Sequence, residues 1–248
     1  MFSALTPAMA ETLKLVVTDV PGLAVGGLPA RKAAAQTFTL GTADVGAIDF
    51  LLADVRALAP GAAGLVGQNV LGLADVEYDL PNGVIRLFQP QGCDAGDGAY
   101  WAKGWRTAEM VAPSPASRLI QATVSINGRS FRASLDTAAP VSVLSLAAAV
   151  RLGLTGREME PTEPAKILGR AAPTWTAPAA SFSLGGEAWR NTRLRIVDAD
   201  LGEGVDMLIG ADFLAAHRVY VATARRRIYF TYYSGPIFAP AGPPPAKR

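Results

Sequence analysis

The chain has 248 residues, enough for one large hydrophobic core or two small ones. Half of the residues are hydrophobic (50%) and 18% are charged, which excludes an intrinsically disordered chain. The net charge of +2 gives no reason to expect nucleic-acid binding, and one cysteine and one histidine exclude an internal disulfide and a multi-histidine metal site. No apolar stretch is long enough to span a bilayer. We therefore expect a globular protein with no cofactor, no metal, no nucleic acid and no membrane span.

The first region, residues 1–88, opens with Ser3-Ala4-Leu5-Thr6-Pro7 and closes on the pattern of a β-hairpin. That pattern is a strand at residues 75–79, a turn at Pro81-Asn82-Gly83 and a strand at residues 84–88. A linker follows at residues 89–116, where Gly, Pro and Ala are frequent. Aromatic residues of this linker, Tyr100, Trp101 and Trp105, are expected to anchor it against the neighbouring lobes rather than to bind a ligand.

The second region, residues 117–234, has mostly the pattern of β-strands. Apolar and polar residues alternate over 120–126 and again over 131–135, and Asn127-Gly128 between them predicts a two-residue hairpin turn. The return strand ends at Asp136, and a short helix is predicted from Ser145 to Leu152, ended by Gly153. Further strands are expected at residues 174–176, 180–184, 193–197, 218–221 and 227–232, with Arg225-Arg226-Arg227 at the last hairpin tip. A Pro-rich tail, residues 235–248, is expected to be extended.

The two regions repeat one sequence pattern in the same order. Placing Ser3 on Ser142 brings Leu5, Leu13 and Leu15 onto Leu144, Leu152 and Leu154. Three later pairs of segments then correspond: 36–41 with 180–185, 65–71 with 208–214, and 84–88 with 227–231. A repeat of this length predicts two packed lobes related by a pseudo-two-fold axis. We expect an all-β fold of two barrel-like lobes in tandem, each with one short helix, the first lobe lacking its N-terminal strands.

One group of residues carries a resemblance to a known family. The strand end Leu135-Asp136-Thr137-Ala138-Ala139, followed about seventy residues later by Leu208-Ile209-Gly210, resembles the retropepsin-like aspartic peptidases. Gly210-Ala211-Asp212 resembles that family's Gly-Arg-Asn/Asp segment at the start of its C-terminal helix, and Gly67-Gln68-Asn69 resembles the same segment in the first copy. As a tandem pair, the chain is similar to bacterial two-lobed aspartyl-protease-like proteins, many of them exported. The resemblance implies pepsin-like or retropepsin-like lobes and an extended peptide or protein as substrate.

The resemblance also implies roles for individual residues. Asp136, Thr137 and Ala138 would form the catalytic loop, in which the Asp136 carboxylate shares one proton with a second carboxylate and activates a water. The Thr137 hydroxyl would tie the two active loops together. Support for the loop would come from Leu208, Ile209, Gly210 and Asp212. Hairpin flaps would close over the peptide at Leu168, Gly169 and Arg170 in the second copy and at Val25, Gly26 and Gly27 in the first.

The first copy departs from the family in the residue that matters most. With Ser3 on Ser142, the partner of Asp136 falls before Met1. The second copy departs from the family as well, because Ala138 stands where the family usually has Gly. Other acids of the first copy do not fit the role: Asp44, Asp49 and Asp54 fall on later strands and loops. Three more, Asp75, Glu77 and Asp79, are expected on a solvated strand face.

Three hypotheses follow for activity. The chain is trimmed and the complete protein is a two-lobed aspartic endopeptidase; or it forms a homodimer in which two copies of Asp136 meet; or it is a non-catalytic peptide-binding or scaffold protein. The family resemblance indicates the periplasm or cell envelope. Residues 1–10 lack the basic start of a signal peptide, so we interpret them as part of the fold. His217 is expected to have a surface or half-buried role without chemistry.

Overall fold

The computed structural model describes residues 2–25, 28–53, 61–89, 99–111, 119–167, 170–202 and 204–238. The chain divides into two compact units, Met1–Leu73 and Ala74–Arg248. Strands dominate both units, and the helices are short. No helix in the described ranges is long and apolar enough to cross a membrane.

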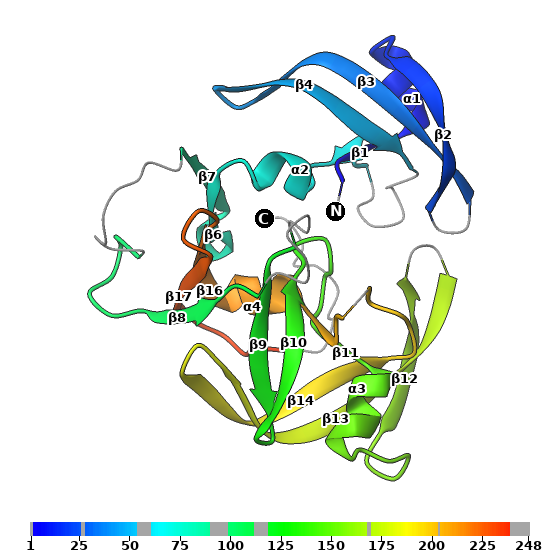
Figure 1. The fold of residues 1–248 in the computed structure, drawn as a ribbon. Helices are drawn as coiled ribbons and strands as arrows, with labels where there is room; N and C mark the ends of the chain where they lie inside the picture. The colour runs from blue at the N-terminus through cyan, green and yellow to red at the C-terminus, as the bar shows by residue number, and fades with distance from the viewer. Residues whose placement is uncertain are drawn as a thin grey trace. The chain divides into compact units, whose positions relative to one another are not determined.

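The first unit is one five-stranded sheet with two short helices (Figure 1). The strand order is β2-β3-β4-β1-β5, so β1 lies between a parallel neighbour, β4, and an antiparallel one, β5. Buried apolar residues of the described part are Ala4, Ala10, Ala33, Phe50 and Val70. The elements are β1 (Ala4–Leu5), α1 (Pro7–Thr12), β2 (Val16–Val25), β3 (Leu28–Leu40), β4 (Ala43–Leu52), β5 (Gly64–Leu65) and α2 (Gln68–Leu71).

The second unit contains a seven-stranded sheet in the order β12-β13-β14-β11-β15-β10-β9. An additional pairing of β9 with β13 closes six of these strands into a barrel. Its elements are β9 (Gln121–Ile126), β10 (Arg129–Leu135), β11 (Val143–Ser145), α3 (Leu146–Leu152), β12 (Glu160–Ile167), β13 (Arg170–Leu184), β14 (Glu187–Val197), β15 (Met207–Ile209) and α4 (Ala211–Ala216).

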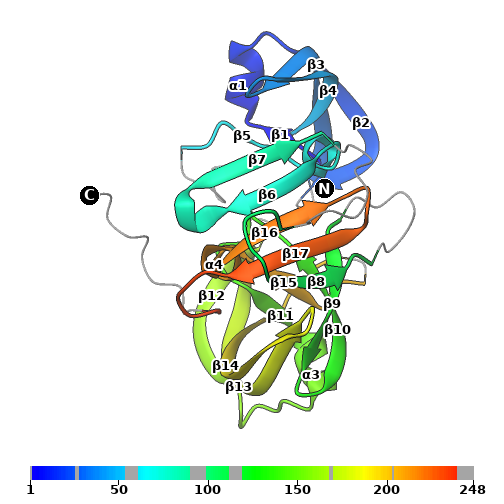
Figure 2. The same ribbon diagram turned by 90° about the vertical axis from the view of Figure 1, so that its left-hand side faces the viewer.

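A second sheet of this unit combines the closing hairpins of both repeat copies (Figure 2). Its order is β7-β6-β16-β17-β8, and β6 pairs antiparallel with β16, with Glu77 opposite Tyr220. The closing hairpin of the first copy therefore belongs to the second compact unit. The strands are β6 (Asp75–Asp79), β7 (Val84–Phe88), β8 (Arg106–Glu109), β16 (His217–Ala222) and β17 (Arg227–Tyr232), with a 3-10 turn at Leu80–Asn82.

The repeat seen in the sequence is present in the topology. Strand, helix, three strands, strand, helix and hairpin follow one another from β1 to β7 and again from β11 to β17. Even the register agrees: Ala4 lies opposite Leu65 and Leu51, as Val143 lies opposite Leu208 and Arg195. Each copy has a second helix, α2 or α4, at the segment that the family resemblance associates with a helix start. These helices begin just after the Gly67 and Gly210 positions.

Local sequence signals account for several elements. Asn127 and Gly128 both have positive φ, at 49° and 78°, as a tight β-hairpin turn requires. Helix α3 is capped by the Ser145 hydroxyl, which accepts from the Ala148 N–H at 3.2 Å, and ends at Gly153 with φ of 93°. The strands expected separately at 174–176 and 180–184 are one strand, β13.

The environment of His217 differs from the expectation, because its side chain is fully buried. The imidazole stacks on Phe213 with ring centroids 3.9 Å apart, and Trp189, Phe230 and Tyr232 surround it. Its Nδ1 lies 2.7 Å from the Phe213 carbonyl oxygen, so Nδ1 carries the proton and donates it there. Nε2 is buried without a partner among the described residues.

Candidate active site

Asp136 directly follows β10, the strand that the hairpin turn returns into the barrel. Its N–H donates to the Ile209 carbonyl at 2.9 Å and so extends the parallel pairing of β10 with β15. One carboxylate oxygen, Oδ1, accepts from the Ala138 N–H at 2.9 Å. In the described part of the chain no group donates to Oδ2, and the side chain is half-buried. Asp136 therefore keeps one oxygen available at the rim of its own loop.

The start of α4 holds the loop that follows Asp136 through hydrogen bonds. Ser142 donates to the Asp212 carboxylate twice, from its N–H at 2.9 Å and from Oγ at 2.6 Å. The same Oγ accepts from the Gly210 N–H at 2.9 Å, and the Ala211 N–H donates to Ala139 O at 2.8 Å. We call the Ser142–Gly210–Asp212 set the loop clamp. Burial raises the pKa of Asp212, and its hydrogen bonds from Ser142 and Phe213 oppose that rise.

Gly210 is required by this clamp because the loop backbone lies against it. A Cβ at this position would lie 2.6 Å from Val141 C and 2.7 Å from Ala139 O, closer than real Cβ contacts. The Leu208-Ile209-Gly210 signal thus combines two functions: β15 supports β10, and its last glycine allows the loop to approach.

The first copy contains an equivalent clamp built from Ser3, Gly67 and Asn69. Ser3 donates to Asn69 Oδ1 from its N–H at 2.7 Å and from Oγ at 2.8 Å, while the Gly67 N–H donates to Ser3 Oγ at 2.9 Å. A Cβ on Gly67 would meet Phe2 C at 2.5 Å. Ser3, Gly67 and Asn69 therefore make hydrogen bonds like those of Ser142, Gly210 and Asp212, with Asn69 in the position of Asp212.

The structure brings together some of the expected site residues. Ile209, Gly210 and Asp212 all contact the Asp136 loop, and their role in supporting a catalytic loop stays a prediction. Ala138 is half-buried, and its N–H rather than its methyl group serves the carboxylate. Thr137 is exposed, and its hydroxyl makes no hydrogen bond within the described ranges.

The described ends of the two predicted flap segments belong to two equivalent hairpins, β2–β3 and β12–β13. Leu168 and Gly169 of the second copy and Gly26 and Gly27 of the first fall outside the described residues. Val25 ends β2 and Arg170 begins β13, so both stand at a hairpin tip. Their function as flap residues stays a prediction.

The acids of β6 are not solvated as expected but buried. Glu77 is 0% exposed and forms ion pairs with Arg86 and with Arg218, the latter at 2.9 Å, while Tyr100 Oη donates to it at 2.6 Å. The guanidinium of Arg218 lies 4.4 Å from the centre of the Trp101 ring, and Trp101 Nε1 donates to Thr231 Oγ1. The linker aromatics therefore anchor the linker, as the sequence predicted, and cover the acidic face.

Asp75, Asp49 and Asp44 each have a partner among the described residues. Asp75 accepts from the Thr223 N–H at 2.8 Å and from Tyr220 Oη at 3.1 Å, and burial beside this carboxylate raises the pKa of Tyr220 to about 12. Asp49 pairs with Lys32 at 2.7 Å, and Asp44 accepts from a turn N–H. Asp54 falls outside the described residues. Within the described ranges, no cluster of three or more His, Cys, Asp or Glu side chains could hold a metal ion.

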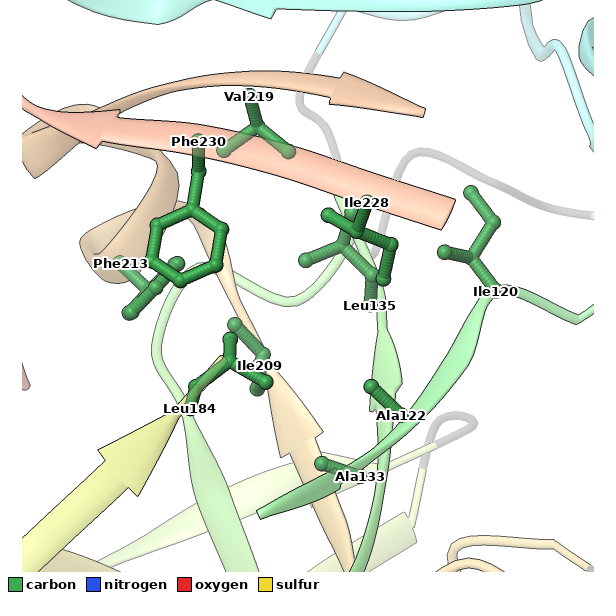
Figure 3. Close-up of a pocket in the computed structure, with 10 residues that line it drawn as sticks. All are labelled: Ile120, Ala122, Ala133, Leu135, Leu184, Ile209, Phe213, Val219, Ile228 and Phe230. Carbon is green, nitrogen blue, oxygen red and sulfur yellow. The ribbon is translucent and has the colours of Figure 1, made fainter. Parts of the chain in front are cut away.

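A small apolar cavity of about 10 Å³ lies between the barrel strands β9, β10 and β15 and the hairpin β16–β17 (Figure 3). This volume is at the lower limit for one water molecule, and a dry apolar gap of this size is a packing defect rather than a ligand site. Ten residues line it: Ile120, Ala122, Ala133, Leu135, Leu184, Ile209, Phe213, Val219, Ile228 and Phe230.

Comparison with known proteins agrees with this geometry. Residues 122–213 match a family model described as Aspartyl protease. The matched segment runs from β9 through the Asp136 loop to Gly210 and Asp212 at the start of α4. The similarity to this family therefore covers the Asp136 loop and the segment that supports it. A search of curated proteins gives no match.

Solved structures similar to the chain include three proteases or protease-like domains. A retropepsin-like aspartic protease from Rickettsia conorii shares 15% identity at a TM-score of 0.40, covering 52% of this chain and 91% of that one. The EIAV protease in complex with the inhibitor HBY-793 shares 23% identity at a TM-score of 0.34, covering 42% and 91%. The retroviral protease-like domain of Ddi1 from Leishmania major shares 19% identity at a TM-score of 0.29, covering 37% and 71%.

Proposed function

We propose that this protein is an aspartic-type endopeptidase in which Asp136 supplies one of two catalytic carboxylates. The observation that carries the proposal is the Asp136 loop: a carboxylate at a strand end with one oxygen available, on a backbone held by the loop clamp. Such a rigid position is what a general base needs, because a proton-accepting oxygen must be held within hydrogen-bonding reach of its water.

The chemistry requires a second carboxylate close to the first. One of the pair is ionised and takes a proton from the water, whose oxygen then attacks the peptide carbonyl carbon. The other is protonated and donates to the carbonyl oxygen. Collapse of the tetrahedral intermediate breaks the C–N bond, and the amine leaves with a proton from the carboxyl pair. We infer an extended peptide as substrate, held through its backbone by the β12–β13 hairpin.

Asp136→Asn tests the proposal, because an amide cannot accept the proton of the water. We expect the variant to lose cleavage of unstructured peptides that carry apolar residues on both sides of the cut, with at least about a hundredfold fall in kcat. Asp198→Asn is the matched control, since Asp198 is an exposed carboxylate outside the loop. Cleavage by the parent should favour mildly acidic to neutral pH and be blocked by statine-type inhibitors.

Assays on the same protein preparation distinguish two alternatives. If cleavage depends on two molecules contributing Asp136, its rate should rise with the square of enzyme concentration, and light scattering should show dimers. The other alternative is a non-catalytic peptide-binding protein of this fold. In that case the parent and Asp136→Asn bind peptides equally well, and neither cleaves them under any of these conditions.

A further inference from the structure

The Asp136 loop depends on α4, a helix too short to fix its own position. This helix has six residues, and its N-cap, Gly210, supplies no side-chain hydrogen bond. A helix of fewer than two turns is marginal by itself, so packing must fix where it lies. Asp212, the acid of the loop clamp, is in its first turn, and the next residue, Phe213, is buried at 1% exposure. The contacts that position the Phe213 ring therefore also position the loop clamp.

Aromatic rings from three other parts of the second unit surround Phe213. The centroid of its ring lies 5.8 Å from that of Trp189 on β14, 6.2 Å from Phe230 on β17 and 6.5 Å from Phe238. His217 is stacked on it at 3.9 Å, but His217 directly follows α4 and moves with the helix. Phe213 and Phe230 also line the small apolar cavity (Figure 3), so packing between these two rings is incomplete. The position of Phe213 depends all the more on Trp189 and Phe238.

Phe238 differs from the other rings because it lies outside the strands and helices. It ends a segment, residues 233–238, that follows β17 and that we call the strap. At the start of the strap, the Tyr233 N–H donates to the carbonyl of Ala216, the last residue of α4, at 2.7 Å. The strap therefore contacts α4 twice, at its last residue through a hydrogen bond and at Phe213 through the Phe238 ring.

The Phe238 ring also contacts the barrel. It meets Phe182 of β13 edge to face, with centroids 4.7 Å apart and ring planes at 89°. Phe182 lies opposite Ile126, in the pairing of β13 with β9 that closes the barrel. Phe238 is 7% exposed and has a φ of 54°, a left-handed conformation that is costly for a bulky residue. The contacts of its ring with the barrel and α4 must outweigh that cost.

We propose that Phe238 is a positioning residue, which holds α4 against β13 and thereby keeps the loop clamp and the Asp136 carboxylate in place. Without the ring a void lies beside Phe213, and α4 can shift towards it because close packing no longer opposes the movement. The hydrogen bonds from Ser142 to Asp212 then open more often. The effect on the loop stands on packing alone, and its consequence for cleavage rests on the proposed function.

Phe238→Ala tests the proposal when amide hydrogen exchange is measured on the full chain. The amides to follow are those of Ser142, Gly210 and Ala211, whose N–H groups are bonded within the clamp and its loop. We expect their exchange to speed up by about tenfold, whereas amides 194–196 of β14 change by less than about twofold. Tyr233→Ala is the matched control, since it removes an aromatic side chain of the strap that is 57% exposed and leaves every amide unchanged.

Phe238→Leu keeps part of the buried volume and should speed exchange at the clamp amides by only about threefold. If Phe238→Ala does not fold, Phe238→Leu decides by the same criterion. Two results overturn the proposal. One is unchanged exchange at Ser142 and Gly210. The other is an equal acceleration at the clamp and at amides 194–196, because Phe238 would then add only to the overall stability of the unit.

The consequence for cleavage is measured separately. Phe238→Ala should lower kcat by about tenfold and leave KM within about twofold, because the misplaced group is the carboxylate and the hairpin that holds the peptide is unchanged. A loss seen only in KM would contradict this consequence. If the clamp amides speed up as expected but the parent cleaves no peptide, the positioning role holds and the endopeptidase function fails.

Discussion

The two copies of the repeat share a hydrogen-bonded clamp but differ in how much apolar volume surrounds it. In the first copy the buried residues are mostly small, with Ala4 and Val70 where the second has Val143 and Phe213. Yet Ser3 and Ser142 make the same contacts at nearly the same distances. The clamp is therefore formed by a serine, a glycine and the first residues of a helix, independently of the size of the core around it. The core around it depends on how many strands cover it.

We expect the largest effect on stability from a substitution of Gly210, the glycine of the loop clamp. Gly210→Ala should destabilise the second unit by about 3 kcal/mol, because the new methyl group meets backbone atoms of Val141 and Ala139 that cannot rotate away. Urea unfolding followed by tryptophan fluorescence measures it, since all four tryptophans belong to the second unit.

Gly156→Ala is the matched control for this substitution, because a Cβ at Gly156 would meet nothing within 4 Å. Gly67→Ala places the same methyl group in the first copy, 2.5 Å from Phe2 C. It should therefore shift the tryptophan transition less than Gly210→Ala does. Equal shifts from Gly210→Ala and Gly156→Ala would show that the loop does not need the close approach.

A second difference between the copies is a titratable residue, His217. Burial lowers the pKa of His217 to about 4, with the hydrogen bond to Phe213 opposing it, and the first copy has Ala74 at the equivalent position. Because the folded pKa is below the ordinary value, the neutral ring is favoured. Its contribution is complete above about pH 6.5 and is lost as pH falls towards 4.

We expect the free energy of unfolding of the second unit to fall by about 2 kcal/mol between pH 7 and pH 5 from this group alone. His217→Phe keeps an aromatic ring beside Phe213 and removes the titration. The free energy of unfolding is plotted against pH for the parent and the variant. The difference between the two slopes gives the contribution of the histidine alone, because the carboxylates titrate in both proteins. Parallel stability curves for the two proteins would contradict the burial of Nε2.

Much of the second copy could be predicted from its sequence because its signals are local. Asn127-Gly128 fixed a hairpin, Ser145 and Gly153 bounded a helix, and alternation identified β9 and β10. The sequence pattern predicts two strands, 174–176 and 180–184, where the structure has the single strand β13, and Pro178 lies in the gap between them. Pro178 lies between the stretches that pair with β12 and β9, where β14 is the one partner among the described strands, so its missing N–H is tolerated.

What the sequence could not predict depends on distant residues. The alternation of Asp75, Glu77 and Asp79 with Val76 and Tyr78 is typical of a half-solvated strand. Arg86 lies opposite Glu77 on β7, but Arg218 and the linker aromatics, which complete the cover of the acidic side, are distant in the sequence and nothing near β6 indicates them. His217 was misjudged for the same reason, since its burial comes from rings on β14 and β17. The candidate site was predictable because its residues form two short motifs that the fold joins.

The smallest expected effect concerns the acid of the clamp, where the repeat itself offers the substitution. Asn69 shows that a single amide oxygen can accept both the N–H and the Oγ of the serine, at 2.7 and 2.8 Å. Asp212→Asn should therefore change the stability of the second unit by less than about 1 kcal/mol, whereas Asp212→Ala leaves two donors of Ser142 unpaired and costs about 1 to 2 kcal/mol. The two variants are compared by urea unfolding and by amide exchange at Ser142, which should speed up only in the alanine variant. If Asp212→Asn loosens the loop as much as Asp212→Ala, charge rather than hydrogen-bond geometry holds the second clamp, and the two copies would differ in kind.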